Sequence, residues 1–226
     1  MNSKAKAGQA AAQLVTDGMR VGLGTGSTAY FMIQALGEAV ARGLSFVGVP
    51  TSRQTAKMAS ELGIQLREPH EVPYLDLTID GADEFDPQLN LIKGGGGALF
   101  REKMVASLSR RMVVITDARK RVPQLGAFPL PVEVVPFGWQ ITAQRMGDMG
   151  LPVQRREGPE GPFLTDNGNY ILDCNCKTIP DPISLHQQLK ALIGVVETGL
   201  FCGMATEVIL GHEDGRIEHI LPEGHG

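Results

Sequence analysis

Residues 19–31 read MRVGLGTGSTAYF. The first six favour a short strand that runs into a glycine turn, because glycine permits the backbone angles that tight turns need. Ser27 or Thr28 can cap the helix that follows, which we expect to continue through Val40 and to stop near Gly43. A strand, a glycine turn and a helix in this order indicate a parallel sheet whose strands are joined by helices.

The same alternation continues on both sides of this stretch. Helices are expected over residues 3–17, from Thr51 or Ser52 to Gly63, and over 97–109, and strands over 44–49, 74–80 and 112–116. This order predicts an α/β fold, a Rossmann-like and mostly parallel sheet flanked by helices.

The pattern changes near Leu125, where the chain becomes rich in proline. Strands are expected over 132–135, 152–156, 170–173 and 194–199, helices over 138–149 and 182–192, and a turn at Asn167-Gly168. This β-α-β-β-α-β order is that of the ferredoxin-like split unit. Residues 204–221 predict two further strands that return to the first sheet. We therefore expect a Rossmann-like catalytic domain at 1–127 and 200–226, with a smaller α+β domain at 128–199 near the C-terminus.

Composition excludes several classes of protein. The 226 residues are 42% hydrophobic and 20% charged, which is typical of a globular protein with a sizeable core. A net charge of -4 argues against nucleic acid as a partner. No apolar run approaches the roughly 18–20 residues that span a bilayer, and the N-terminus lacks the pattern of a signal peptide. We therefore expect no membrane partner.

The three cysteines, Cys174, Cys176 and Cys202, predict the redox compartment. A low, odd number in a chain of this length fits a reducing, cytoplasmic location. A C-x-C pair and scattered histidines do not form the spacing of a zinc site. We expect no metal, and interpret the cysteines as strand residues.

The first candidate site is GLGTGST, residues 22–28. Amides at a helix N-terminus, beside Ser and Thr hydroxyls, can bind an anion. The pattern differs from a dinucleotide fingerprint, because Ser27 stands where the last glycine belongs, and it lacks the Gly-Lys-Ser/Thr of a P-loop. The loop is suited to one phosphate group, although a tight turn with an ordinary cap would have the same sequence.

The second candidate site is DGADEFD, residues 80–86, which follows a predicted strand. Strand C-termini in such sheets face the ligand crevice, so Asp80 and Asp83 are expected to project where a ligand binds. Lys120 follows another strand end in TDARK and is expected to face the same crevice. Asp-Gly also favours turns, which leaves a structural interpretation of the aspartates open.

The third candidate site is LIKGGGGALFREK, residues 91–103. Four consecutive glycines are entropically unfavourable to order and indicate a close approach to the main chain. Lys93 beside exposed amides can stabilise an oxyanion or a phosphate. Glu102 has apolar helix neighbours, and partial burial would raise its pKa towards that of a general base. Arg101 has nearly as apolar a neighbourhood, so periodicity does not choose between them.

These loops lie on one edge of one predicted sheet. Together they offer a phosphate cradle, two aspartates, a lysine with glycine amides and a glutamate, without a metal, a nucleophile arrangement or a redox motif. Proton abstraction next to a carbonyl is the chemistry that remains, with donors that stabilise the enediolate.

With these motifs the chain resembles ribose-5-phosphate isomerase of the A type. The resemblance extends from GLGTGSTA through PTS, DGADEFD, KGGGGALFREK and TDARK to TGLF. It implies interconversion of D-ribose 5-phosphate and D-ribulose 5-phosphate in the non-oxidative pentose phosphate pathway, with no metal or organic cofactor. A sugar phosphate is the implied ligand, and a homodimer or homotetramer the implied assembly.

The resemblance also implies a role for individual residues. Glu102 corresponds to the base of the family, which decides against Arg101. In the mechanism that we expect, Asp80 or Asp83 assists ring opening and Lys93 holds the enediolate. A contact of Lys4 with the phosphate stays open. The implied substrate-binding residues are Thr25, Gly26, Ser27, Thr28, Asp80, Gly81, Ala82, Asp83, Lys93, Gly94, Gly95, Gly96 and Lys120.

Two other functions would use a similar phosphate loop. A non-enzymatic sugar-phosphate-sensing domain would not need Glu102 and Lys93 together. An amino-sugar-phosphate isomerase or deaminase would be expected to have a histidine near its aspartate, and residues 80–86 contain none.

Overall fold

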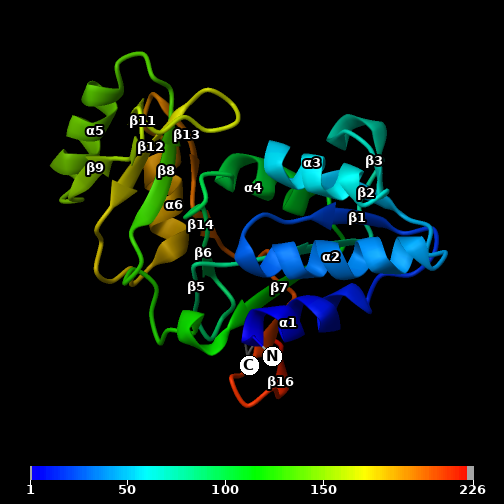
Figure 1. Ribbon diagram of the computed structural model, residues 1–226. Coiled ribbons are helices and arrows are strands. Elements are labelled where there is room, and N and C mark those ends of the chain that lie inside the picture. The colour runs from blue at the N-terminus through cyan, green and yellow to red at the C-terminus, as the bar shows by residue number, and fades with distance from the viewer. Residues whose placement is uncertain (1, 223–226) are drawn as a thin grey trace.

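A seven-stranded sheet forms the core of the larger part of the chain in the computed structural model, which describes residues 2–222 (Figure 1). The strand order is β16-β15-β7-β4-β1-β2-β3. The strands are β1 (Arg20–Leu23), β2 (Val47–Pro50), β3 (Gln65–Leu66), β4 (Leu77–Asp80), β7 (Met112–Asp117), β15 (Glu207–Gly211) and β16 (Ile217–Ile220). Every neighbouring pair is parallel except β15–β16, so the predicted α/β fold with a mostly parallel sheet is confirmed.

Helices cover both faces of this sheet (Figure 1). The connecting helices are α1 (Ser3–Ala12), α2 (Ser27–Ala41), α3 (Arg53–Glu61) and α4 (Leu99–Ser107). In α2, the buried residues Ala29, Met32, Ile33 and Leu36 repeat at helical spacing and pack with Val21 and Leu23 of β1. On the opposite face, Val105 of α4 packs against Val49 of β2. The strand ends are therefore held between two helical layers.

A second sheet belongs to what we call the small unit, residues 130–198. Its antiparallel order is β13-β8-β12-β9, built from β8 (Leu130–Val134), β9 (Val153–Arg155), β12 (Tyr170–Cys174) and β13 (Val195–Thr198). Helices α5 (Trp139–Asp148) and α6 (Pro182–Lys190) complete the β-α-β-β-α-β order that the sequence predicts. The division into domains 1–127 with 200–226 and 128–199 stays a prediction, and residues 1 and 223–226 of it lie outside the described part.

Several short elements differ from the sequence prediction. The sequence did not predict two small sheets, one of β10 (Glu157–Gly158) with β11 (Gly161–Pro162) and one of β14 (Leu200–Phe201), β6 (Leu91–Ile92) and β5 (Glu84–Phe85). It also did not predict two 3-10 turns, η1 (Pro69–Glu71) and η2 (Ala118–Lys120). Two-residue strands are too short to produce an alternating pattern. The predicted helix 3–17 ends at Ala12, because Leu14 and Val15 donate to carbonyls three residues back and turn Val15 into the core.

Within residues 2–222, every helix is too short or too polar to span a lipid bilayer.

Candidate active site

A cavity of about 130 Å³ opens where β1, β4 and β7 end. Every predicted site residue except Asp80 lines it. The lining residues are Lys4, Thr25, Gly26, Ser27, Thr28, Gly81, Ala82, Asp83, Lys93, Gly94, Gly95, Gly96, Glu102, Thr116, Asp117 and Lys120. The parallel topology explains this convergence, because the carboxyl ends of parallel strands meet at one edge of the sheet.

One wall of the cavity is the turn between β1 and α2. Gly26 has a φ of 111°, which favours glycine, and no side chain caps the N-terminus of α2. The Thr25 hydroxyl lies 2.7–3.1 Å from the hydroxyls of Thr51, Ser52 and Thr55 and is fixed by them. Lys4 Nζ donates to Ser27 Oγ at 2.8 Å. Open helix amides, hydroxyls and an ammonium group together favour an anion here.

Asp80 lies beneath the cavity and does not line it, so the expectation that its side chain projects towards a ligand is wrong. Its side chain is fully buried. Oδ1 accepts hydrogen bonds from the amides of Thr25 (3.0 Å) and Gly81 (2.7 Å), and Oδ2 lies 3.0 Å from Lys93 Nζ. Asp80 therefore fixes two loops and one lysine from behind.

Gly24 makes room for this carboxylate, and we expect Gly24→Ala to lower Tm. A Cβ at Gly24 would clash with the side chain and Cα of Asp80. Overpacking of this kind costs about 1–3 kcal/mol, and each kcal/mol corresponds to about 2–4 °C for a chain of this length. Thermal unfolding measures the change. Gly147→Ala in α5, where a Cβ meets nothing within 4 Å, is the control and should not lower Tm. Equal Tm values would contradict the steric argument.

Lys93 and Glu102 form a buried ion pair at the base of the cavity. Their side chains are 2% and 6% exposed, and Lys93 Nζ lies 3.2 Å from Glu102 Oε1. Nζ also donates to the carbonyl oxygen of Gly81. The second oxygen of Glu102, Oε2, is buried without a hydrogen-bond partner among the described residues. One carboxylate oxygen is thus held by the lysine, and the other has no hydrogen-bond partner within residues 2–222.

Arg101, which periodicity alone did not separate from Glu102, lies on a different side of α4. Its side chain is 34% exposed, and its Nε donates to Asn167 Oδ1 at 2.8 Å. Glu102 is the charged side chain of this pair that lines the cavity.

Burial and charge determine the protonation of this pair. Burial, followed by the negative charge of Asp80, raises the pKa of Glu102 to about 8, although Lys93 acts in the opposite direction. Burial alone would lower the pKa of the Lys93 ammonium. The carboxylates of Asp80 and Glu102 outweigh burial, so the pKa of Lys93 lies above its ordinary value. A cation thus faces a carboxyl group that can exchange a proton near neutral pH.

The glycine loop, residues 94–97, forms the roof above this pair. Gly94 and Gly97 have φ angles of 106° and 81°, which side chains rarely adopt. The Gly95 amide donates to Asp83 Oδ2 at 2.7 Å, and a Cβ at Gly95 would clash with Asp83. Asp83 is therefore held against the glycine loop, where it lines the cavity.

Thr116 and Asp117, the last two residues of β7, also line the cavity and are not among the site residues predicted from the sequence. The rule that selected Lys120, position just after a strand end, would have selected them too. A hydrogen bond from the Arg119 guanidinium, at 3.0 Å, lowers the pKa of Asp117. Among residues 2–222, no three His, Cys, Asp or Glu side chains are grouped as metal ligands.

Comparison with known proteins gives consistent matches. Residues 47–215 match the family model of ribose 5-phosphate isomerase A (phosphoriboisomerase A). Ribose-5-phosphate isomerase A 1 of Oceanobacillus iheyensis is 52% identical over 212 residues, which are 93% of this chain and 95% of the relative.

Solved structures agree with this match. Ribose 5-phosphate isomerase A from Methanocaldococcus jannaschii superposes with a TM-score of 0.92 at 38% identity, covering 97% of this chain and 98% of that one. A D-ribose-5-phosphate isomerase in complex with phospho-erythronic acid has a TM-score of 0.94 at 38% identity, covering 98% of this chain and 100% of its own.

Proposed function

This chain belongs to the ribose 5-phosphate isomerase A family, and from that premise we propose how its cavity performs the reaction. The protein is an aldose–ketose isomerase of sugar metabolism that interconverts D-ribose 5-phosphate and D-ribulose 5-phosphate. The proposal rests on the buried Glu102, because one of its carboxylate oxygens is paired with Lys93 and the other has no hydrogen-bond partner among the described residues. A sensing domain is not favoured, since binding alone does not require this pair.

The substrate phosphate binds at the N-terminus of α2. The amides of residues 26–28 and the hydroxyls of Ser27 and Thr28 face the phosphate oxygens, and Lys4 and Lys120 neutralise their charge. The complex of a related isomerase with phospho-erythronic acid supports a phosphorylated sugar acid or sugar as the ligand class. With the phosphate at one end, the carbons of the sugar extend towards Asp83 and Glu102.

Ring opening falls to Asp83, because Asp83 lines the cavity and Asp80 does not. The Asp83 carboxylate accepts the proton of the anomeric hydroxyl while the bond between C1 and the ring oxygen breaks. The ring oxygen then takes a proton from water. Asp80 contributes through Lys93, whose ammonium it holds at 3.0 Å.

Glu102 carries the isomerisation step. It removes the proton from C2, and the carbonyl oxygen on C1 gains the negative charge of the enediolate. The hydroxyl proton of O2 moves to O1, and Glu102 returns its proton to C1 to give the ketose. The Lys93 ammonium and the amide of Gly96 are the donors nearest to the developing charge.

Incubation of the purified protein with ribose 5-phosphate in the presence of EDTA tests the function. Formation of ribulose 5-phosphate, followed as ketose, is the expected result. Tight binding of ribose 5-phosphate without ketose would contradict the isomerase and favour the sensing domain.

The raised pKa of Glu102 leads to a pH prediction. The base must be ionised, so kcat/KM should fall tenfold per pH unit below an apparent pKa near 8, instead of near the ordinary value of about 4.3. A profile between pH 5 and 10 measures this limb. The second ionisation of a phosphate ester, at a pKa of about 6, gives a separate limb that substrate titration identifies. Full activity at pH 5 would contradict the assignment.

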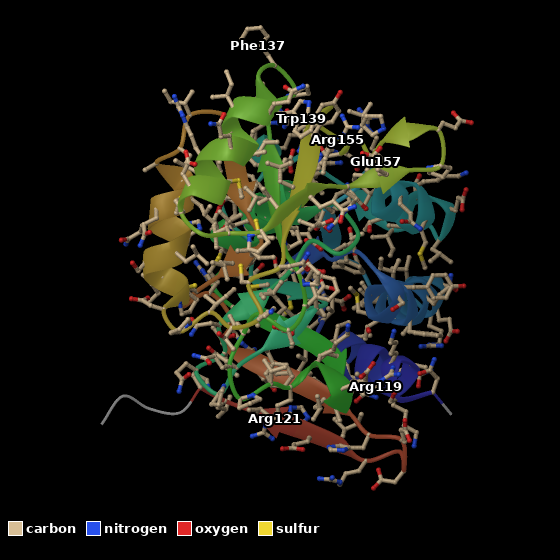
Figure 2. All side chains as sticks on the ribbon, turned by 90° about the vertical axis from the view of Figure 1, so that its left-hand side faces the viewer. Arg119, Arg121, Phe137, Trp139, Arg155 and Glu157 are labelled. Carbon is tan, nitrogen blue, oxygen red and sulfur yellow. The ribbon has the colours of Figure 1, made fainter. Side chains whose placement is uncertain are left out.

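Two broader proposals concern assembly and location. An apolar surface at one end of the small unit, Val135, Phe137, Ile141 and Ile193, supports a homodimer or homotetramer, and Phe137 is 94% exposed and points outwards in Figure 2. Sedimentation velocity of the full chain measures the assembly, and a monomer at micromolar concentration would contradict it. The three free cysteines support a cytoplasmic location, which cell fractionation tests.

A further inference from the structure

We propose that Arg156, from the small unit, is a positioning residue that fixes the orientation of the glycine-loop peptides facing the substrate. The inference rests on the proposed role of the Gly96 amide as a donor to the enediolate and of Asp83, which the Gly95 amide holds, in ring opening. It adds to that role a guanidinium that approaches the loop from outside the cavity and that is not among the cavity-lining residues.

Arg156 binds two successive carbonyls of the loop. Its Nη1 donates to Gly94 O and to Gly95 O, both at 3.0 Å. In a trans peptide the N–H points away from the C=O, so holding a carbonyl also aims the next amide. The Gly95 amide is thereby directed to Asp83, at 2.7 Å. The Gly96 amide has no acceptor among residues 2–222, and Gly96 lines the cavity.

The guanidinium is itself held rigidly. Its Nε and Nη2 donate to Asp173 Oδ2 and Oδ1 at 2.9 and 2.6 Å, the paired arrangement in which an arginine fork matches a carboxylate. Asp173 lies on β12, and the Arg156 amide donates to Ile171 O on the same strand at 2.8 Å. The side chain is 16% exposed. The guanidinium is therefore held in place by contacts within the small unit and is largely shielded from solvent.

The loop supplies one hydrogen bond of its own, from the Gly97 amide to Gly94 O at 2.9 Å, so its middle peptides depend on contacts from outside the loop. Four glycines leave the peptides free to rotate, and an unfixed donor loses most of its value in the transition state. Phe163 adds a second contact from the small unit. A Cβ at Gly97 would clash with the Phe163 ring, which lies 5.6 Å from the Arg156 guanidinium. The ring and the guanidinium thus enclose the loop from the side opposite the substrate.

Arg156→Met tests the proposal, with Arg155→Met as the matched control. Arg155 is the preceding residue, but its guanidinium lies 4.7 Å from the Trp139 ring and binds Glu157, away from the loop (Figure 2). We expect Arg156→Met to lower kcat by about 10- to 100-fold, since small misplacements of catalytic groups cost about that much. KM should change by less than about threefold, because the phosphate loop is untouched. Arg155→Met should retain kcat within about twofold.

Inhibitor binding distinguishes positioning from a general structural role. Phospho-erythronic acid presents a carboxylate where the enediolate forms, whereas inorganic phosphate needs only the turn at α2. In Arg156→Met the inhibition constant of the acid should rise by about the factor by which kcat falls, and that of phosphate should stay unchanged. A change in both constants would indicate a general structural defect and overturn the proposal.

Two further variants keep the test decisive if Arg156→Met folds poorly. Arg156→Lys keeps the charge without the fork, and Asp173→Asn keeps the guanidinium but weakens its support, so each should give a smaller kcat loss of the same kind. Values of kcat within twofold of wild type in all three variants, or an equal loss in Arg155→Met, would overturn the proposal. In each of these outcomes the wild type still forms ketose, so only the role of Arg156 is contradicted. A wild type that forms no ketose would contradict the proposed function itself.

Discussion

Glu102→Gln is expected to lower kcat by about 10²- to 10⁴-fold, the usual contribution of a general base, with little change in the affinity for ribose 5-phosphate. The amide fills the same space and can still accept a hydrogen bond from Lys93, which lies 3.2 Å from Oε1. It cannot take up a proton from C2. The proposed phosphate site is the turn at the N-terminus of α2, which the substitution does not touch, so we expect binding in the ground state to be preserved.

Arg101→Gln is the matched control for Glu102→Gln. It introduces the same amide at the adjacent position, where the side chain reaches Asn167 and not the cavity. Ketose formation under saturating substrate, together with substrate binding by calorimetry, separates kcat from affinity. Turnover of Glu102→Gln within tenfold of wild type would remove Glu102 from the role of proton shuttle.

Lys93→Met should have the second largest effect, on catalysis and stability together. Loss of a donor to an oxyanion costs about 10²- to 10³-fold in kcat. Removing one member of a buried ion pair costs about 3–5 kcal/mol, which corresponds to roughly 6–20 °C in Tm at about 2–4 °C per kcal/mol. The reason is that Asp80 and Glu102 lose their shared cation while fully enclosed.

The pH profile of Lys93→Met tests the electrostatic description of the pair by the direction in which the pKa of Glu102 moves. Lys93 lowers the pKa of Glu102, so its removal lets burial and Asp80 raise that pKa further. The acid limb of kcat/KM should therefore move to higher pH than in the wild type. A limb displaced to lower pH would contradict the electrostatic description of the pair.

Lys103→Met separates the two effects of Lys93→Met. Lys103 is also a largely buried lysine, paired with Glu197 at 2.9 Å, and it lies 4.8 Å from the same Phe201 ring that is 5.4 Å from Lys93. We expect Lys103→Met to lose stability but to retain kcat within a few-fold. If both variants lost kcat in proportion to Tm, the loss in Lys93→Met would be one of folding only.

Local patterns were sufficient to predict the sheet and the glycine turn between β1 and α2. The turn at residues 24–28 depends on a strand, glycines and a helix start that are contiguous in the sequence, although the N-cap residue is Gly26 and the expected cap by Ser27 or Thr28 is not formed. Asp80 shows the limit of this reasoning. A strand-end rule places its Cα at the crevice, but the direction of its carboxylate depends on Gly24, which follows a different strand, β1.

The choice between Arg101 and Glu102 required tertiary contacts or a family resemblance. Both have apolar neighbours on α4, and Asn167, which binds Arg101, belongs to the small unit. Arg156 is a further example, because nothing near it in sequence indicates Gly94 or Gly95. Contacts between distant segments leave no periodic trace, so they became visible only with the fold.

The pairing of β15 with β7 has a consequence for biosynthesis. As the chain leaves the ribosome, β1, β2, β3, β4 and β7 can pair early, but the free edge of β7 waits for residues 207–211. All of residues 118–206 are translated in between. Until then the nascent protein presents an open, apolar strand edge, the kind of surface that recruits chaperones or aggregates. Although the cavity residues are all translated by position 120, their supporting sheet is completed almost last.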